Sequence, residues 1–220
     1  MYVSGYGELN PEDITPADLG EARREALPKT EISLIRDRSV TTAADGLSFP
    51  NTMVITPNGR TLIVAETFGF RISAYDRDPK SGALTNRRVW AQLGMPVDGI
   101  CLDAEGCIWA AIPYTFPFNP LRNPLATLWA YARAGHPVGA CIRLAEGGAI
   151  LDKIFLPSHW AIACMLGGPM GNTLFILGAV EFDEEKVKKL GDENSVILAT
   201  KVNIPAATDA ANPRYWGGVC

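Results

Sequence analysis

The fold is decided by the stretch Asn51-Thr-Met-Val-Ile-Thr-Pro-Asn-Gly-Arg-Thr-Leu-Ile-Val-Ala-Glu-Thr67. Two runs rich in β-branched and aliphatic residues flank the turn Pro57-Asn58-Gly59, and Asn-Gly between such runs is a strong hairpin signal. Two further strands are expected at Arg71–Asp76 and Arg87–Leu93, with a Pro/Ser/Gly turn between them. The pattern therefore predicts four short antiparallel strands in immediate succession.

The same pattern recurs twice further along the chain, as strand, Gly-containing turn and strand. The first copies are separated by about 47 residues, which is the period of a four-stranded propeller blade. The repeat therefore predicts a β-propeller. The later predicted strands lie within Asp98–Ala111, Cys141–Ala145, Ala149–Ile154, Trp160–Leu166, Thr173–Gly178 and Ser195–Val202.

The residues before Asp45 fit part of one more blade. Strands are expected at Met1–Ser4, Glu31–Arg36 and Ser39–Ala44. Between the first two, Thr15-Pro16 suits the start of a helix over 17–27, which we interpret as a surface excursion. A second helix, short and exposed, is expected within 180–194, where Glu and Lys recur at i,i+4 spacing.

We divide the chain, as one propeller domain over 1–220, into a partial first blade 1–46, a blade 47–95, a blade 96–157, a last blade 158–205 and a tail 206–220. The third of these contains a Pro-rich insertion over 112–134. Three interpretations of the insertion stay open: a lid on the substrate side, a segment packed on the outside, or an artefact of gene prediction.

Composition restricts the class of protein. The chain is 47% hydrophobic and 20% charged, as expected of a globular protein with a sizeable core. Its net charge is −4 without a cluster of Lys and Arg, so we expect no nucleic-acid partner. No apolar run is long enough for a membrane span, and we see no secretory leader. The five Cys form no CxxC pair, so we expect buried thiols and a cytoplasmic location.

An ordered set of motifs resembles the regucalcin (senescence marker protein)/gluconolactonase/luciferin-regenerating enzyme-like family of six-bladed propellers. The resemblance covers about Asp45–Ala179. It implies an all-β fold, a β-propeller of the six-bladed family with about four blades in this chain. The motifs are Phe49-Pro-Asn51, Thr56-Pro-Asn-Gly-Arg-Thr-Leu62, Arg71-Ile-Ser-Ala-Tyr-Asp76, Leu84-Thr-Asn-Arg-Arg88, Asp98-Gly-Ile-Cys-Leu-Asp-Ala-Glu-Gly106 and Cys164-Met-Leu-Gly-Gly168.

The resemblance also implies a function, the metal-dependent hydrolysis of lactones or related esters, which are small-molecule substrates. Asn51 and Asp98 match two family ligands of one divalent metal ion, calcium or zinc. Asp98 is in addition the usual residue that activates water. Oxygen ligands suit a hard cation, and a carboxylate beside the cation can accept a proton from water.

The chain also departs from the family pattern. Two further family ligands, a Glu and an Asn, precede the segment that Met1 matches, so we expect the chain to start about two blades late. Thr52 stands where the family usually has Gly, and a β-branched residue would suit a positive φ badly. Glu8, Asn10 and Glu66 are weak substitutes for the missing ligands.

These departures leave alternatives open. The chain could be a catalytically silent truncated paralogue, or a binding or scaffold propeller. It could also be part of a gene product that extends upstream. Uncovered blade faces would favour self-association.

Overall fold

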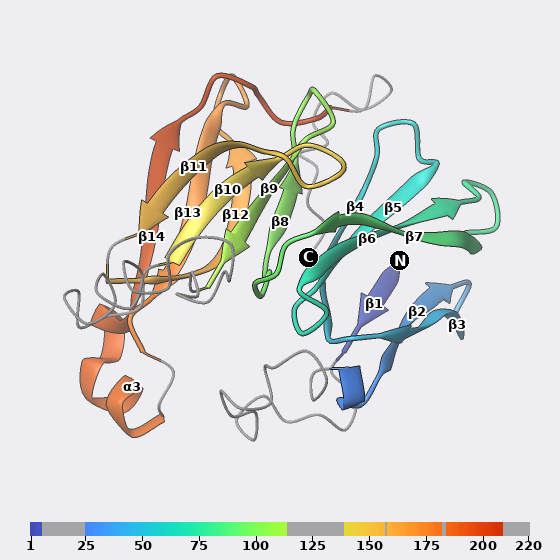
Figure 1. Ribbon diagram of the computed structural model, residues 1–220, viewed down its shortest axis with the longest axis horizontal. Coiled ribbons are helices and arrows are strands. Elements are labelled where there is room, and N and C mark those ends of the chain that lie inside the picture. Colours follow the sequence, from blue (N-terminus) through green and yellow to red (C-terminus); the bar gives the residue numbers. More distant parts are fainter. Residues whose placement is uncertain (6–24, 114–138, 157, 182–183, 209–220) are drawn as a thin grey trace.

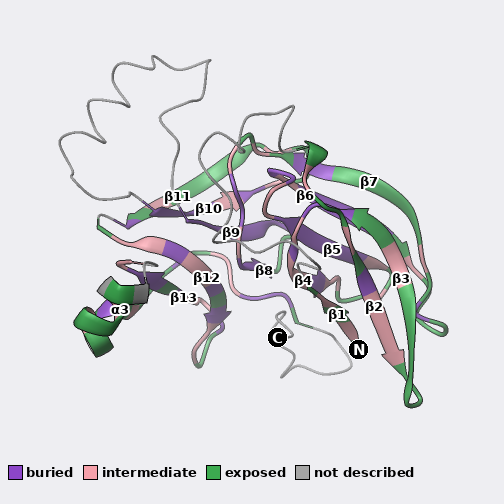
Figure 2. Cartoon of the chain, turned by 90° about the horizontal axis from the view of Figure 1, so that it is seen from below, coloured by how far each residue is buried: buried purple, intermediate pink, exposed green. Residues whose placement is uncertain are grey.

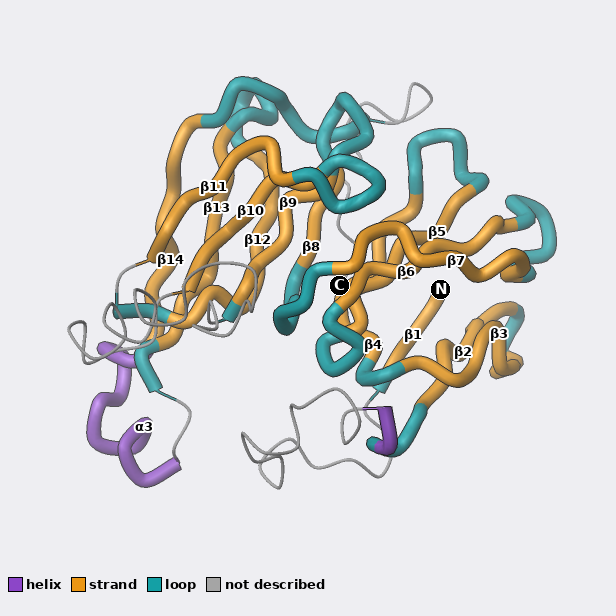
Figure 3. Tube along the Cα trace, in the orientation of Figure 1, coloured by secondary structure: helices purple, strands orange, loops and turns teal. Residues whose placement is uncertain are grey.

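The computed structural model describes residues 1–5, 25–113, 139–156, 158–181 and 184–208. These residues form four antiparallel sheets, joined mostly by short turns, with little helix (Figure 3). The predicted helix over 17–27 lies outside the described residues apart from its last turn, as do nearly all of the 112–134 insertion and the end of the tail.

The first two sheets are built from the N-terminal half of the chain (Figure 1). The first has the strand order β1-β2-β3, and the second has the order β4-β5-β6-β7. Their strands are β1 (Tyr2–Ser4), β2 (Thr30–Arg36), β3 (Ser39–Leu47), β4 (Pro50–Ile55), β5 (Thr61–Glu66), β6 (Arg71–Arg77) and β7 (Leu84–Gln92).

The other two sheets follow in the C-terminal half. The third has the order β8-β9-β10-β11, and the fourth has the order β12-β13-β14. A short helical segment, α3 (Glu184–Leu190) followed by η3 (Gly191–Asn194), connects β13 to β14, as the Glu/Lys spacing predicts. The strands are β8 (Ile100–Leu102), β9 (Ile108–Ile112), β10 (Gly139–Leu144), β11 (Ile150–Leu156), β12 (Trp160–Gly167), β13 (Thr173–Ala179) and β14 (Ser195–Lys201).

Each neighbouring pair of sheets shares a hydrophobic core. The first core joins the first and second sheets through residues such as Ile32 and Val64, and the second joins the second and third sheets through Ile63 and Ile108. A third core, around Trp109 and Leu174, joins the third and fourth sheets. The middle strands β5 and β9 are therefore buried on both faces, whereas β3, β7 and β11 are mostly exposed (Figure 2).

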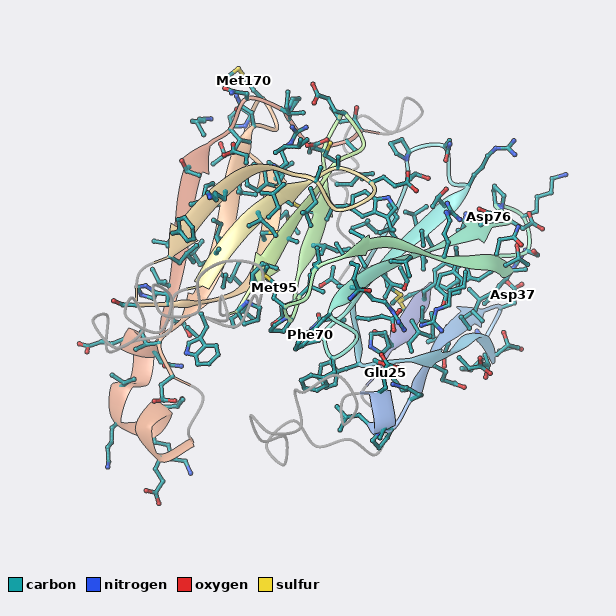
Figure 4. All side chains as sticks on the ribbon, viewed as in Figure 1. Glu25, Asp37, Phe70, Asp76, Met95 and Met170 are labelled. Atoms are coloured by element: carbon teal, nitrogen blue, oxygen red, sulfur yellow. The ribbon has the colours of Figure 1, made fainter. Side chains whose placement is uncertain are left out.

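The sheets pack face to face in chain order around a common inner side. In Figure 4, Met95, in the β7–β8 connection between the second and third sheets, and Phe70, in the β5–β6 turn, lie near the centre of the view, and Asp76 lies at its periphery. This arrangement confirms the predicted fold class, an all-β propeller with about four blades in this chain. In the described part of the chain, no helix has the length and apolar character needed to span a membrane.

Candidate functional site

The structure brings the two predicted site residues into direct contact. Asn51 lies at the start of β4, and Asp98 lies just before β8, the inner strand of the next sheet. The Asn51 amide Nδ2 donates a hydrogen bond of 2.5 Å to Asp98 Oδ1. Residues 47 positions apart therefore meet at the junction between two blades, at the end where both inner strands begin.

Backbone contacts on both sides fix the position of Asp98. Its N–H donates to Ala111 O at 2.9 Å, and the N–H of Gly99 donates to Ile162 O in the fourth sheet at 2.9 Å. A Cβ atom on residue 99 would lie 2.6 Å from the Cα of Ala163. The Asp-Gly sequence thus has a steric reason, because only glycine lets this segment approach β12 so closely.

Thr67 is a third polar residue at this end, and it was missed at the level of sequence. Its hydroxyl donates to Val97 O at 2.8 Å and accepts a bond of 3.4 Å from Asn51 Nδ2. Hairpin register could have found it, because β4 and β5 pair Pro50 with Glu66 and so place Thr67 beside the start of β4. Thr67 thereby links Asn51 to the segment that carries Asp98.

Asp98 lies in an environment that disfavours its charge. Burial raises its pKa to about 7, and the hydrogen bond from Asn51 opposes this shift only partly. Within the described ranges, no Lys, Arg or His forms an ion pair with this carboxylate. A partly buried, uncompensated carboxylate is a group that a bound cation or a proton would stabilise.

The donor set fits a hard divalent cation in type but is small. Asn51 and Asp98 offer side-chain oxygens, and calcium in proteins takes six to eight oxygen ligands, some of them from water. Among the described residues there is no group of three or more His, Cys, Asp or Glu side chains that could hold a metal ion. A cation held by this pair would therefore draw most of its ligands from water or substrate.

Glu66 does not act as a substitute ligand. Its carboxylate is fully buried and accepts hydrogen bonds from Arg71 at 3.0 and 3.1 Å and from Arg87 at 2.8 Å. Ser73 Oγ and the Ser48 N–H also donate to it. Burial alone would raise the pKa of Glu66, but these bonds outweigh burial and hold the pKa below its ordinary value. The other two weak substitutes, Glu8 and Asn10, lie outside the described residues.

The expected difficulty at Thr52 does not arise. Thr52 lies within β4 and is not among the residues with positive φ. The left-handed residue near the site is Phe49, with φ 58°, just before the strand. Its ring packs edge to face on Phe68, with centroids 4.9 Å apart. The replacement of glycine by Thr52 is therefore compatible with the backbone.

A hollow of about 480 Å³ opens beside the Asn51–Asp98 pair. Its walls come from β1 and from the inner strands β4, β8 and β12, together with one residue of β13. We call it the inner hollow. It is lined by Met1, Tyr2, Val3, Ser4, Asn51, Thr52, Met53, Gly99, Ile100, Ala163, Cys164, Met165 and Leu177.

Solved structures support the architecture. The chain superimposes on luciferin-regenerating enzyme with a TM-score of 0.60 at 16% identity, covering 80% of this chain and 53% of that one. It superimposes on regucalcin of Agrobacterium tumefaciens, described as a calcium-binding protein, with a TM-score of 0.58 at 19% identity and the same coverage. At these identities the likeness establishes the fold.

Sequence comparisons agree. The chain is 28% identical over 162 residues to regucalcin of Xenopus laevis, covering 71% of this chain and 46% of the relative. It is 28% identical over 145 residues to 6-deoxy-6-sulfogluconolactonase of Pseudomonas putida, covering 64% of this chain and 40% of the relative. The chain thus spans about half the length of the curated relatives it matches. Residues 21–180 match the SMP-30/Gluconolactonase/LRE-like region, and the chain belongs to this family.

Proposed function

We propose that the protein is a metal-assisted hydrolase of lactones or related esters. Asp98 is the base that activates water, and Asn51 and Asp98 are the side-chain ligands of one divalent cation, calcium or zinc. Membership of the family supports the reaction class, because gluconolactonases are among its members. The observation that carries the proposal is the partly buried carboxylate of Asp98, bonded to Asn51 at the edge of a substrate-sized hollow.

The pKa of Asp98 suits a general base. A base works best when its pKa lies near the working pH, and burial raises the pKa of Asp98 to about 7. The ionised carboxylate takes a proton from water while the water oxygen attacks the lactone carbonyl carbon. When the tetrahedral intermediate collapses, the ring C–O bond breaks, the departing oxygen takes up the proton, and a hydroxy acid is formed.

Asn51 positions the base. Its amide donates to Oδ1 of Asp98, which leaves the second carboxylate oxygen, Oδ2, for water. A divalent cation held by this pair would polarise the substrate carbonyl and stabilise negative charge on its oxygen. Thr67 also holds Asn51, because its hydroxyl accepts a hydrogen bond from the same amide nitrogen, Nδ2.

The test compares Asp98→Asn with a matched substitution far from the site. Asp37→Asn is the control, because Asp37 lies in the β2–β3 turn with its side chain 89% exposed. We expect lactone hydrolysis to fall about 100-fold or more in Asp98→Asn, the usual contribution of a general base, and to stay unchanged in Asp37→Asn. Equal hydrolysis by both variants would contradict the proposal.

Calorimetric titration with Ca²⁺ and Zn²⁺ tests the cation separately. One-to-one binding that is lost in Asp98→Asn and kept in Asp37→Asn would support the two ligands. The small donor set favours a second candidate, a catalytically silent propeller that binds a small molecule. This candidate predicts neither cation binding nor hydrolysis in the unaltered chain.

A further inference from the structure

The inner hollow differs in character from the polar pair beside it. Its wall includes the apolar side chains of Val3, Ile100, Met165 and Leu177, and three of them remain exposed: Val3 40%, Met165 38% and Leu177 43%. Exposed apolar side chains that gather in a concave surface, rather than singly, mark a binding site for an apolar group.

Polarity within the hollow is confined to one part of the wall. Ser4, Asn51 and Thr52 supply its polar side chains apart from the Tyr2 phenol, whose oxygen is engaged with Gly82 O at 2.7 Å. Ser4 Oγ donates to Asn51 O at 3.3 Å, so β1 and β4 meet at this polar part. Gly99, which also lines the hollow, directly follows Asp98 in the chain. The apolar wall is therefore continuous with the Asn51–Asp98 pair.

Among the described residues that line the hollow, there is also no Lys, Arg, Asp, Glu or His side chain. The α-ammonium group of Met1 is turned to Ile35 O, to which it donates at 2.9 Å. A charged substituent in the hollow would therefore lose hydration without gaining an ion pair, whereas a neutral apolar one would gain by leaving water. The methionines of the lining suit substituents of variable shape, because their side chains are flexible.

We propose that the inner hollow binds the alkyl or acyl substituent of a neutral lactone or ester, with the carbonyl end at Asn51 and Asp98. This inference rests on the proposed function and adds the class of substrate. It predicts a preference for alkyl-substituted lactones over polyhydroxylated sugar lactones.

The experiment uses lactams, which resemble lactones but are hydrolysed far more slowly, so that binding is measured without turnover. Calorimetry with 5-butyl-, 5-hexyl- and 5-octyl-2-pyrrolidinone should show affinity rising about two- to fourfold for each added methylene. Met165→Gln, in the wall, should weaken octyl lactam binding about fivefold to tenfold and flatten the dependence on chain length. Met170→Gln is the matched control, because Met170 is 70% exposed at the tip of the β12–β13 turn, outside the hollow (Figure 4).

Each outcome has a defined meaning. Affinity that does not depend on chain length, or an equal loss in Met165→Gln and Met170→Gln, overturns the inference. The inference is also overturned if sedimentation shows that the chain forms a dimer through the hollow and that octyl lactam does not dissociate this dimer. If chain-length-dependent binding occurs but lactones are not hydrolysed, the hollow is a binding site and the proposed function fails. If alkyl and sugar lactones are hydrolysed equally well, the proposed function survives and this inference fails.

Discussion

Glu66, in the second sheet, and Asp98, at the start of the third, are two carboxylates whose surroundings shift their pKa values in opposite directions. Glu66 is fully buried, yet two guanidinium groups and two further donors hold its pKa below the ordinary value. Asp98 retains partial exposure and faces one amide, and its pKa is raised to about 7. The number of donors facing each carboxylate, rather than its depth, decides whether it stays ionised. The five hydrogen bonds of Glu66 join strands of the second sheet to the β3–β4 connection, whereas the one bond that Asp98 accepts from the described side chains leaves it free to react.

The largest loss of stability from a single substitution is expected from breaking the Glu66 network. Glu66→Gln removes the charge that pairs with Arg71 and Arg87, whose side chains are 22% and 32% exposed. Because both cations can partly reach water, we expect a loss of about 3 kcal/mol in the free energy of unfolding, near the lower end for a broken buried ion pair. Urea unfolding measures the loss.

Asp76→Asn provides the control for this prediction. Asp76 also pairs with an arginine, Arg88, at 2.8 Å, but at the surface. Removal of a surface ion pair should leave stability almost unchanged. Similar losses of stability in Glu66→Gln and Asp76→Asn would mean that the buried ion pairs of Glu66 contribute no more to stability than a surface ion pair.

The second prediction concerns the pH dependence of stability in chelator-treated protein. The folded-state pKa of Asp98, about 7, lies above its ordinary 3.8, so the folded state binds the proton more tightly. Stability should therefore fall as pH rises from about 4 to 7, by up to about 1.4 kcal/mol per unit. Asp98→Asn should remove this slope, as seen by urea unfolding at several pH values.

The pKa of Glu66 predicts the opposite sign in a lower window. The folded-state pKa of Glu66 is depressed, so the stability that its ionised carboxylate adds is present above pH 4.5 and is lost as pH falls through the folded-state pKa. The slope above pH 4.5 should therefore be the same in Glu66→Gln as in the unaltered chain. A slope between pH 4 and 7 that persists in Asp98→Asn would contradict the assignment to Asp98.

The third prediction tests how Asp98 is positioned. Gly99→Ala places a Cβ atom 2.6 Å from Ala163 Cα and 3.1 Å from Ile162 O, both backbone atoms of the next sheet. We expect a loss of about 1–3 kcal/mol in stability from this overpacking, together with weaker cation binding. Gly5→Ala is the control, because a Cβ there meets nothing within 4 Å. If Gly99→Ala is destabilised but binds the cation with unchanged affinity, the contact of Gly99 with the next sheet stabilises the fold without positioning Asp98.

Much of the fold could be predicted from sequence because its signals are local. Asn58-Gly59 specifies a hairpin, and Asn58 Oδ1 accepts bonds from Thr56 Oγ1 and the Arg60 N–H in the turn itself. The resemblance predicts Asn51 and Asp98 as ligands of one metal ion, but their direct hydrogen bond could not be predicted because the residues are 47 positions apart in the chain. The Glu66 network could not be predicted, because it depends on how β7 and the β3–β4 connection pack around β5. The steric role of Gly99 likewise depends on contact with the next sheet.

The smallest effect is expected at Thr67, the polar residue that sequence patterns did not indicate. Thr67→Val keeps the shape of the side chain but removes the 2.8 Å bond to Val97 O and the 3.4 Å bond from Asn51 Nδ2. Loss of these two partly buried hydrogen bonds, the second of which is long, should lower stability by about 1 kcal/mol. Because Asn51 then lacks one of its anchors, hydrolysis should fall further than stability implies. Thr67→Ser removes the methyl group but keeps the hydroxyl, so its rate of hydrolysis should stay close to that of the unaltered chain. Equal losses of hydrolysis in Thr67→Ser and Thr67→Val would show that Thr67 acts through packing alone.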